Sequence, residues 1–311
     1  MAKIFIDGAA GTTGLRIHER LSGRQDIELL HIPDEARKDA SVRAEYLNAA
    51  DVAFLCLPDQ AAIEAVSLVS NPDTVIIDTS TAHRTKDGWT YGFPELEGYR
   101  ERIAASKRIA NPGCHASGFI ALVQPLVSCG VLSADAQLSC FSLTGYSGGG
   151  KKMIAQYEAD GRDPLFDAPR MYGISQNHKH LPEMAKISGL SYDPVFCPIV
   201  ADYLVGMEVV VPLFADQVHG GIEAIREAYQ AAYDQSAGGV VSFVEKADED
   251  GFLAANAWAD CDTMQVTVEG NDERILLVSR FDNLGKGASG AAIQNMNIVL
   301  GLPEATGLEL R

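Results

Sequence analysis

Several features are missing from this sequence of 311 residues, and each absence narrows the class of protein. It has no uninterrupted apolar run near the ~20 residues of a membrane span. A strand-like segment begins at residue 3, which leaves no room for a signal or transit peptide. Positive charge is scarce, since 25 Lys and Arg oppose 42 Asp and Glu for a formal net charge of -17. We therefore expect a cytoplasmic protein that binds neither nucleic acid nor a membrane surface.

Paired cysteines are also missing. The sequence has no CxxC motif and no zinc-type spacing. His178 and His180 are two residues apart, and no acidic or thiol ligand spacing accompanies them, so no metal site is expected. Most of the cysteines are predicted to be free thiols that act as small buried hydrophobic residues. They stand at positions 56, 114, 129, 140, 197 and 261.

The hydrophobic pattern changes along the chain and predicts two domains. In the first third, short apolar runs at 3–9, 27–32, 51–58 and 74–80 lack polar alternation and are separated by helical patterns. Such runs are typical of a Rossmann-type, doubly wound parallel sheet, which we place over residues 1–113. Longer alternating runs, with a helix expected over 220–235, predict an α+β catalytic and dimerisation domain with a mixed sheet over 114–285.

A glycine-rich loop follows the first strand. Gly8, Gly11 and Gly14 in GAAGTTG lead directly into the helical pattern LRIHERL. Glycines there allow the backbone N–H groups at a helix N-terminus to approach a pyrophosphate closely. The loop predicts a dinucleotide site, although the same glycines would also suit a turn that binds nothing.

The end of the second strand bears on the choice of dinucleotide. Asp34 and Glu35 favour NAD through the ribose hydroxyls, whereas Arg37 and Lys38 would hold the 2′-phosphate of NADP. Both kinds of residue are present, and the local sequence leaves the choice open.

Cys114 follows the turn Asn111-Pro112-Gly113 and precedes apolar residues at helical spacing. The spacing predicts that Cys114 lies at a helix N-terminus, where the dipole stabilises a thiolate and free N–H groups can hold an oxyanion. This indicates a nucleophile. The alternative is a small residue that fills the entry turn of a helix.

A nucleophilic thiol that acts on a bound substrate needs a proton-transfer partner. The segment NHKHLPEM supplies His178, His180 and Glu183, and its Pro182 suits the first turn of a helix. A buried structural histidine pair remains the alternative. His115 is expected to point away from Cys114. The remaining histidines are expected at the surface, and they are His18, His31, His83 and His219.

Eight motifs together resemble the semialdehyde dehydrogenase superfamily, and within it the short form of the N-acetyl-gamma-glutamyl-phosphate reductases. The resemblance runs over nearly the whole chain, and the order and spacing of the motifs make it specific. The loop GAAGTTG differs from the GxSGYxG of longer members, as the short form requires. The motifs are GAAGTTG, FLCLPD, DTSTAHR, YGFPEL, ANPGCHASG, TGYSGGGKK, NHKHLPEM and NLGKGASGAAIQNMN.

The resemblance implies NADPH-dependent reduction of N-acetyl-L-glutamyl 5-phosphate to the 5-semialdehyde through a cysteine thioester, in arginine biosynthesis. It implies Cys114 as nucleophile and His180, rather than His178, as acid/base. It also implies a homo-oligomer, dimer or tetramer, with the exposed face of the second sheet as a subunit contact, and a last helix (286–311) that rejoins the first domain. The implied NADP(H) contacts are Gly8, Gly11, Thr12, Thr13, Gly14, Arg37, Pro58, Ser80, Ser147, Gly148, Gly149, Asn283 and Gly287.

The substrate anions need cations, and Arg84 is the first choice because a guanidinium clamps oxyanions bidentately. Lys151 and Lys179 lie in the matching motifs too, and Glu183 would orient His180 or support its helix. Sister activities on the same chemistry, aspartate-semialdehyde dehydrogenase or aminoadipyl-phosphate reductase, are the alternatives within enzymes. An NADP-sensing regulator with a dead site is the alternative outside them.

Overall fold

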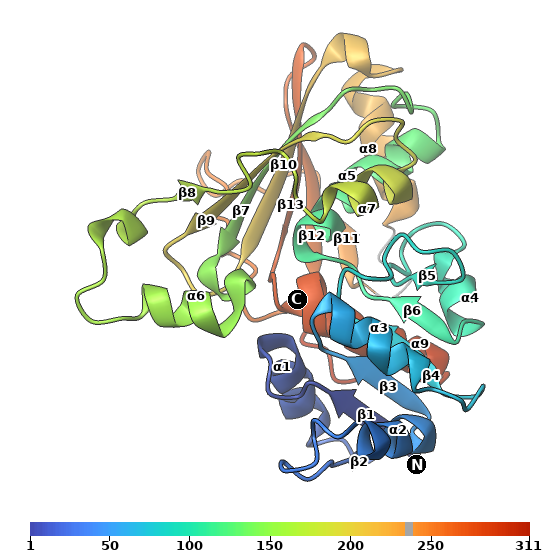
Figure 1. Cartoon of the computed structure of the whole chain (residues 1–311). Coiled ribbons are helices and arrows are strands. Elements are labelled where there is room, and N and C mark those ends of the chain that lie inside the picture. The colour runs from blue at the N-terminus through green and yellow to red at the C-terminus, as the bar shows by residue number, and fades with distance from the viewer. Residues whose placement is uncertain (234–238) are drawn as a thin grey trace. The chain divides into compact units, whose positions relative to one another are not determined.

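The computed structural model describes residues 1–233 and 239–311, and these form two compact units (Figure 1). Unit 1 comprises Met1–Pro94, Gly98–Pro112 and Ala288–Leu308. Unit 2 comprises Glu95–Glu97, Gly113–Gly287 and Glu309–Arg311. Unit 1 is therefore built from both ends of the chain.

Unit 1 is built on a sheet in which every strand pairing is parallel. Its order is β2-β1-β3-β4-β6-β5. The chain moves outward from β1 to β2 and then crosses to β3 on the other side of β1, which confirms the Rossmann-type prediction. The strands are β1 (Ala2–Asp7), β2 (Ile27–Leu30), β3 (Val52–Leu55), β4 (Val75–Asp78), β5 (Thr90–Tyr91) and β6 (Arg108–Ala110).

Helices cover both faces of this sheet because the side chains of β1 alternate between two apolar cores. Ile4 and Ile6 pack in a core with residues of α1, α4 and α9, whereas Phe5 packs in the other core with residues of α2 and α3. The helices are α1 (Thr12–Leu21), α2 (Ala40–Ala49), α3 (Asp59–Ser67), α4 (Tyr99–Ala104) and α9 (Gly290–Val299).

Unit 2 contains a mixed sheet in the order β11-β12-β13-β10-β7-β9-β8. The pairs β11–β12 and β7–β9 are parallel and the other pairs are antiparallel. The strands are β7 (Ser139–Gly145), β8 (Arg170–Met171), β9 (Val195–Ala201), β10 (Met207–Phe214), β11 (Val241–Phe243), β12 (Met264–Gly270) and β13 (Arg274–Phe281).

One face of this second sheet carries helices and the other is partly open. Along β10, residues 207, 209, 211 and 213 are buried, whereas 208, 210 and 212 are half-buried and 214 is exposed. The helices of unit 2 are α5 (Cys114–Ser128), α6 (Gly150–Tyr157), α7 (Leu181–Ser188) and α8 (Gly221–Ala232), with short 3₁₀ helices η1 (Tyr146–Gly149), η2 (Pro164–Asp167) and η3 (Ala215–Gln217).

Two local predictions need adjustment. The last helix, expected over 286–311, is shorter: α9 covers Gly290–Val299 and follows directly on a π-helical turn, η5 (Gly285–Ser289). The helix expected over 220–235 is α8, and positions 234 and 235 of that prediction lie outside the described residues. All six cysteines are free thiols, as predicted, but Cys129 is exposed.

Candidate active site residues

The glycine loop of unit 1 joins the end of β1 to α1. Gly8 has φ +91°, and a Cβ there would lie 2.3 Å from the carbonyl oxygen of Cys56. A Cβ on Gly14 would lie 2.5 Å from the oxygen of Gly8. A side chain is therefore excluded at Gly8 and at Gly14, and a hydrogen bond from Gly11 N to Gly8 O (3.0 Å) closes the turn.

The first turn of α1 leaves its backbone donors available to an anion. The helix begins at Thr12, its N-cap is Gly11, and no side chain caps it. Thr12 and Thr13 lie in this turn and are half-buried. Uncapped N–H groups at the positive end of a helix dipole fit a pyrophosphate, so the residues present fit a bound dinucleotide.

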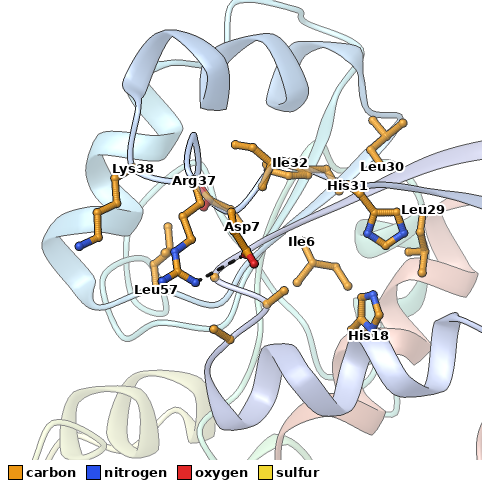
Figure 2. Close-up of a pocket in the computed structure, with 15 residues that line it drawn as sticks. Ile6, Asp7, His18, Leu29, Leu30, His31, Ile32, Arg37, Lys38 and Leu57 are labelled. Carbon is orange, nitrogen blue, oxygen red and sulfur yellow. Dashed lines mark ion pairs between the residues drawn. The ribbon is translucent and has the colours of Figure 1, made fainter.

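A pocket of about 390 Å³ adjoins the loop, and Figure 2 shows its lining. Arg37 and Lys38 lie on one side of it, and His18 and His31 lie on the other (Figure 2). The two imidazoles meet edge to face with their centroids 5.5 Å apart. Arg37 forms an ion pair with Asp34 at 3.8 Å, in which both side chains are exposed. Of the acidic and basic residues weighed from the sequence, Asp34, Arg37 and Lys38 line this pocket and Glu35 does not.

Pro58 and Ser80 follow neighbouring strands of the same sheet. Pro58 is the N-cap residue of α3 and is exposed. Ser80 is buried and donates from its Oγ to Asp78 Oδ2 (2.7 Å) at the end of β4.

His83 does not lie at the surface, which corrects the prediction. It is 1% exposed, its Nδ1 lies 2.6 Å from Asp78 Oδ2, and its ring stacks on Trp89 with centroids 4.0 Å apart. A buried carboxylate five residues earlier accounts for this position, because it supplies a hydrogen-bond partner for a buried imidazole.

Arg84 lies in unit 1 and is half-buried. Its Nε donates to the carbonyl oxygen of Asn111 (3.0 Å) and its Nη2 to that of Thr79 (3.1 Å). Its guanidinium therefore holds two loop segments that follow β4 and β6.

Cys114 is the first residue of α5, as predicted, and lies in unit 2. The N-cap residue is Gly113 with φ -80° and ψ 145°, and no side chain caps the helix. The thiol is half-buried. The half-buried thiol therefore lies at the positive end of the helix dipole.

Glu183 connects the start of α5 to the predicted acid/base histidine. Its Oε2 accepts a hydrogen bond from Gly113 N (3.2 Å), and its Oε1 lies 3.9 Å from His180 Nε2. Glu183 is 1% exposed, and His180 is the buried N-cap residue of α7. Pro182 occupies the first turn of that helix, as predicted.

Three histidines cluster around His115, the residue that follows Cys114. The ring centroid of His180 lies 4.8 Å from that of His178 and 5.6 Å from that of His115. His178 Nδ1 accepts a hydrogen bond from the backbone N–H of His180 (3.2 Å). His115, set aside from the sequence, therefore belongs to the same cluster.

A second chain of hydrogen bonds runs through His115. Its Nδ1 lies 2.6 Å from Ser142 Oγ on β7, and its Nε2 lies 2.7 Å from Tyr172 Oη. Burial lowers the pKa of His115 to about 3, and the neighbouring His178 adds to this effect. Sequence patterns did not point to Ser142 or Tyr172, because neither residue belongs to a motif of this chemistry.

The predicted nicotinamide contacts of unit 2 also come together. Asn283 is buried, donates to Ser147 Oγ (2.9 Å) and accepts from Gly206 N (2.9 Å). A Cβ on Gly148 would lie 3.6 Å from Asn283 Nδ2, and Gly149 follows at the end of η1.

Gly287 lies directly against the nucleophile. A Cβ at this position would be 3.0 Å from the Cβ of Cys114 and 3.1 Å from the carbonyl oxygen of Asp282. Only glycine therefore leaves the Cys114 side chain its present position.

The predicted lysines lie at the surface of unit 2. Lys151 is in the first turn of α6, and Lys179 separates His178 from His180; both are exposed. Among residues 1–233 and 239–311, no group of three or more His, Cys, Asp or Glu side chains is arranged to hold a metal ion. In that same part of the chain, no helix has the length and apolarity needed to span a bilayer.

Two family models match the chain. Residues 3–106 match the semialdehyde dehydrogenase NAD binding domain, and residues 114–283 match the semialdehyde dehydrogenase dimerisation domain. The chain therefore belongs to the semialdehyde dehydrogenase family.

Two relatives of high identity are named as N-acetyl-gamma-glutamyl-phosphate reductases. N-acetyl-gamma-glutamyl-phosphate reductase from a Chelativorans species is 49% identical, over 96% of this chain and 98% of that protein. N-acetyl-gamma-glutamyl-phosphate reductase 2 from a Nostoc species is 47% identical, over 98% of this chain and 99% of that protein.

Among solved structures, aspartate semialdehyde dehydrogenase II from Vibrio cholerae superimposes with a TM-score of 0.69 at 15% identity, over 97% of this chain and 98% of that one. The aspartate semialdehyde dehydrogenase from Candida albicans, solved with NADP, gives a TM-score of 0.66 at 14% identity, over 97% of this chain and 99% of that one. At these identities the match establishes the fold alone.

Proposed function

We propose that this protein reduces N-acetyl-L-glutamyl 5-phosphate to N-acetyl-L-glutamate 5-semialdehyde and inorganic phosphate with NADPH, a step of arginine biosynthesis. One observation carries the proposal. Glu183 accepts a hydrogen bond from the N–H of Gly113, the residue before Cys114, and its other carboxylate oxygen lies beside His180. The high identity to proteins named for this activity supports the acetylated substrate over the sister activities. A regulator with a dead site would not need this arrangement.

The first half of the reaction transfers the acyl group to sulfur. The Cys114 thiolate attacks the carbonyl carbon of the acyl phosphate and forms the C–S bond. The bond between that carbon and the bridging oxygen then breaks, and the oxygen leaves with the electron pair as part of inorganic phosphate. The uncapped N-terminus of α5 stabilises the negative charge on the carbonyl oxygen meanwhile. The product is a thioester on Cys114.

The second half reduces that thioester. NADPH, when bound, supplies the hydride. His180 gives a proton to the oxygen that becomes a hydroxyl and takes it back as the C–S bond breaks, which releases the aldehyde and returns the thiolate. Glu183 keeps the imidazole in place for both transfers.

The NADP(H) contacts implied by the family are kept as proposals. The loop from Gly8 to Gly14, with Thr12 and Thr13, would bind the pyrophosphate, because the helix start is uncapped and a Cβ would fill the loop. Arg37, with Lys38, would bind the 2′-phosphate, since both line the adjoining pocket. The other proposed contacts are Pro58, Ser80, Ser147, Gly148, Gly149, Asn283 and Gly287.

Cations for the substrate carboxylate and the leaving phosphate are proposed at Arg84, Lys151 and Lys179. The exposure of both lysines supports their access to a ligand. Residues 1–113 with 286–311 are proposed to form the nucleotide domain and 114–285 the catalytic domain, and the match of the two family models supports this division. The six free thiols suit a reducing compartment, and we propose the cytoplasm.

The open face of the second sheet is proposed to pair two copies of the chain. Neighbouring strands place apolar side chains on this face, and the match to the dimerisation domain model covers it. The most exposed of them are Phe141 (40%), Met171 (49%), Val195 (58%), Phe214 (65%) and Leu276 (39%).

The function is tested by following nicotinamide absorbance in the oxidative direction. Purified protein receives NADP, inorganic phosphate and either N-acetylglutamate semialdehyde or aspartate semialdehyde, with NAD in parallel. Phosphate-dependent reduction of NADP with the acetylated aldehyde alone is the expected result. Activity with aspartate semialdehyde would assign the sister reaction, and no activity with either aldehyde in protein that binds NADP would favour a sensor.

A further inference from the structure

The turn η5 contains the glycine that packs against the nucleophile. A Cβ on Gly287 would lie 3.0 Å from Cys114 Cβ and 3.3 Å from Phe281 Cε2, so the backbone of this turn lies directly against the Cys114 side chain. The chain passes from unit 2 to unit 1 after Gly287, within the same turn. A displacement of the turn at this point would therefore change the space available to the sulfur.

Asp282 holds the start of this turn. Its carboxylate accepts hydrogen bonds from the backbone N–H groups of Leu284 (2.7 Å), Gly285 (3.0 Å) and Asp260 (2.7 Å). Its carbonyl oxygen accepts from Gly287 N (3.1 Å). These contacts fix the backbone that leads into the turn, and a further contact comes from the side chain immediately before Gly287.

That side chain belongs to Lys286. Its Nζ donates to both carboxylate oxygens of Glu95, at 2.7 and 2.8 Å, and the two side chains are 1% and 10% exposed. Glu95 lies 191 positions earlier, in the segment Glu95–Glu97 that belongs to unit 2. An ammonium removed from water requires an opposite charge in place of its hydration, so the carboxylate determines where the Lys286 side chain lies.

We propose that Lys286 is a positioning residue for Cys114, whose ion pair with Glu95 holds the η5 turn so that Gly287 confines the nucleophilic side chain at the N-terminus of α5. The proposal rests on the proposed function for its effect on turnover. The confinement itself belongs to the resting protein. A confined sulfur stays at the positive end of the helix dipole and in line for attack, and small misplacements of a reacting atom slow a reaction strongly.

A buried ion pair also contributes to folding, and one variant separates the two roles. Removing one partner of such a pair is strongly destabilising, whereas replacing both by uncharged residues of similar size is often neutral. Lys286→Met combined with Glu95→Gln, here called the neutral pair, removes the attraction and is expected to keep the urea midpoint of the wild type. A pair that served stability alone would then leave the reactivity of Cys114 unchanged.

The test measures how fast iodoacetamide alkylates Cys114 at each pH, without substrate or nucleotide. The Cys114 peptide is quantified by mass spectrometry because Cys129 is also exposed. In the neutral pair the midpoint is expected to rise by up to about one pH unit, since a sulfur that leaves the first turn of a helix loses the dipole's stabilisation of its thiolate. Alkylation at pH 7 then slows by up to about 10-fold and recovers at higher pH.

Two further comparisons test the route and the specificity of the effect. In Gly287→Ala the Cys114 side chain is already displaced, so adding the neutral pair should change alkylation less than it does in the wild-type background. The control is Glu249→Gln, which removes the charged partner of Arg280 (2.7 Å), another buried cation of unit 2. Its profile should match that of the wild type. The matched single variant, Glu95→Gln, should shift the midpoint in the same direction as the neutral pair.

Superimposable profiles for the neutral pair and the wild type would overturn the proposal, and so would an equal shift in Glu249→Gln. Additive effects of Gly287→Ala and the neutral pair would overturn the route through the turn. If the neutral pair does not fold, Glu95→Gln decides by the same criteria.

Because alkylation needs no substrate, it reports on Lys286 even if the semialdehyde assay of the wild type is negative. With an active wild type, kcat of the neutral pair should fall about 10- to 100-fold while KM for the substrate and for the nucleotide stays near the wild-type value.

Discussion

The carboxylate of Glu183 accepts a hydrogen bond from the backbone N–H of Gly113, the residue immediately before Cys114. The two groups are 70 positions apart in the chain and buried together. The second oxygen of the same carboxylate lies 3.9 Å from His180 Nε2. One side chain therefore fixes the entry to the nucleophile's helix and lies beside the proposed acid/base.

Substitution of Glu183 should separate its two contacts. Glu183→Gln keeps an acceptor for Gly113 N–H but removes the charge beside His180, so turnover falls while urea stability changes little. Glu183→Ala also leaves a buried N–H without an acceptor, which costs about 1–3 kcal/mol. We expect lower turnover in both and a lower urea midpoint only in the alanine variant. Equal stability losses would show that the charge, rather than the acceptor, holds this segment.

Cys114→Ser tests the covalent route. The hydroxyl is a far weaker nucleophile at neutral pH, so turnover should fall by several orders of magnitude. NADPH affinity, measured by fluorescence titration, should stay close to that of the wild type. Comparable turnover in the serine variant would exclude a thioester.

His180→Asn should depress both acyl transfer and hydride transfer, each followed in single-turnover experiments. His178→Asn is the matched variant, because His178 lies 4.8 Å from His180 by ring centroid and uses Nδ1 as an acceptor for a backbone N–H. If only His178→Asn loses both steps, the assignment within the pair must be reversed.

Gly287→Ala should displace the nucleophile. The new methyl group would lie 3.0 Å from Cys114 Cβ, closer than ordinary van der Waals contact, and the carbonyl of Asp282 lies nearly as close. We expect slower alkylation of Cys114 and lower kcat. Gly23→Ala is the control, because a Cβ there meets nothing within 4 Å. Wild-type activity in Gly287→Ala would mean that the η5 turn relaxes without cost.

His115 should make the protein less stable in acid. Its pKa falls from an ordinary 6.5 to about 3 on folding, so the unfolded chain binds a proton between these values and the folded protein does not. Stability is therefore fully present above pH 6.5 and decreases toward pH 3, by up to about 1.4 kcal/mol per pH unit. Urea unfolding of His115→Asn from pH 7 to 4 should show a shallower decline than the wild type. Parallel curves would indicate that His115 is protonated in the folded state.

Local sequence patterns were sufficient for the elements that depend on neighbouring residues. The strand, glycine loop and helix around Gly8 were predicted because periodicity and backbone sterics act over a few positions. Cys114 was placed at the start of α5 for the same reason, since a Pro-Gly turn precedes an apolar helical pattern.

The rest of the candidate site depends on contacts between distant segments. Ser142 and Tyr172 reach His115 from 27 and 57 positions away, and no periodicity reports on such pairs. His115 was expected to point away from Cys114 because neighbouring residues on a helix point in different directions. Side chains from other segments nevertheless meet His115 in the folded protein. His83 was wrongly expected at the surface, because its pairing with the carboxylate of Asp78 could not be recognised from the local sequence.

The last helix completes the core of the first unit, and this affects how the protein emerges during synthesis. Ile293 and Met296 of α9 pack with Ile4 and Ile77. A nascent chain that has finished every strand of that sheet still lacks the helix that covers one apolar face, until almost all of unit 2 has been translated. The first segments made are therefore among the last to reach a closed core, and their apolar surface stays uncovered during synthesis for longer than their position in the chain suggests.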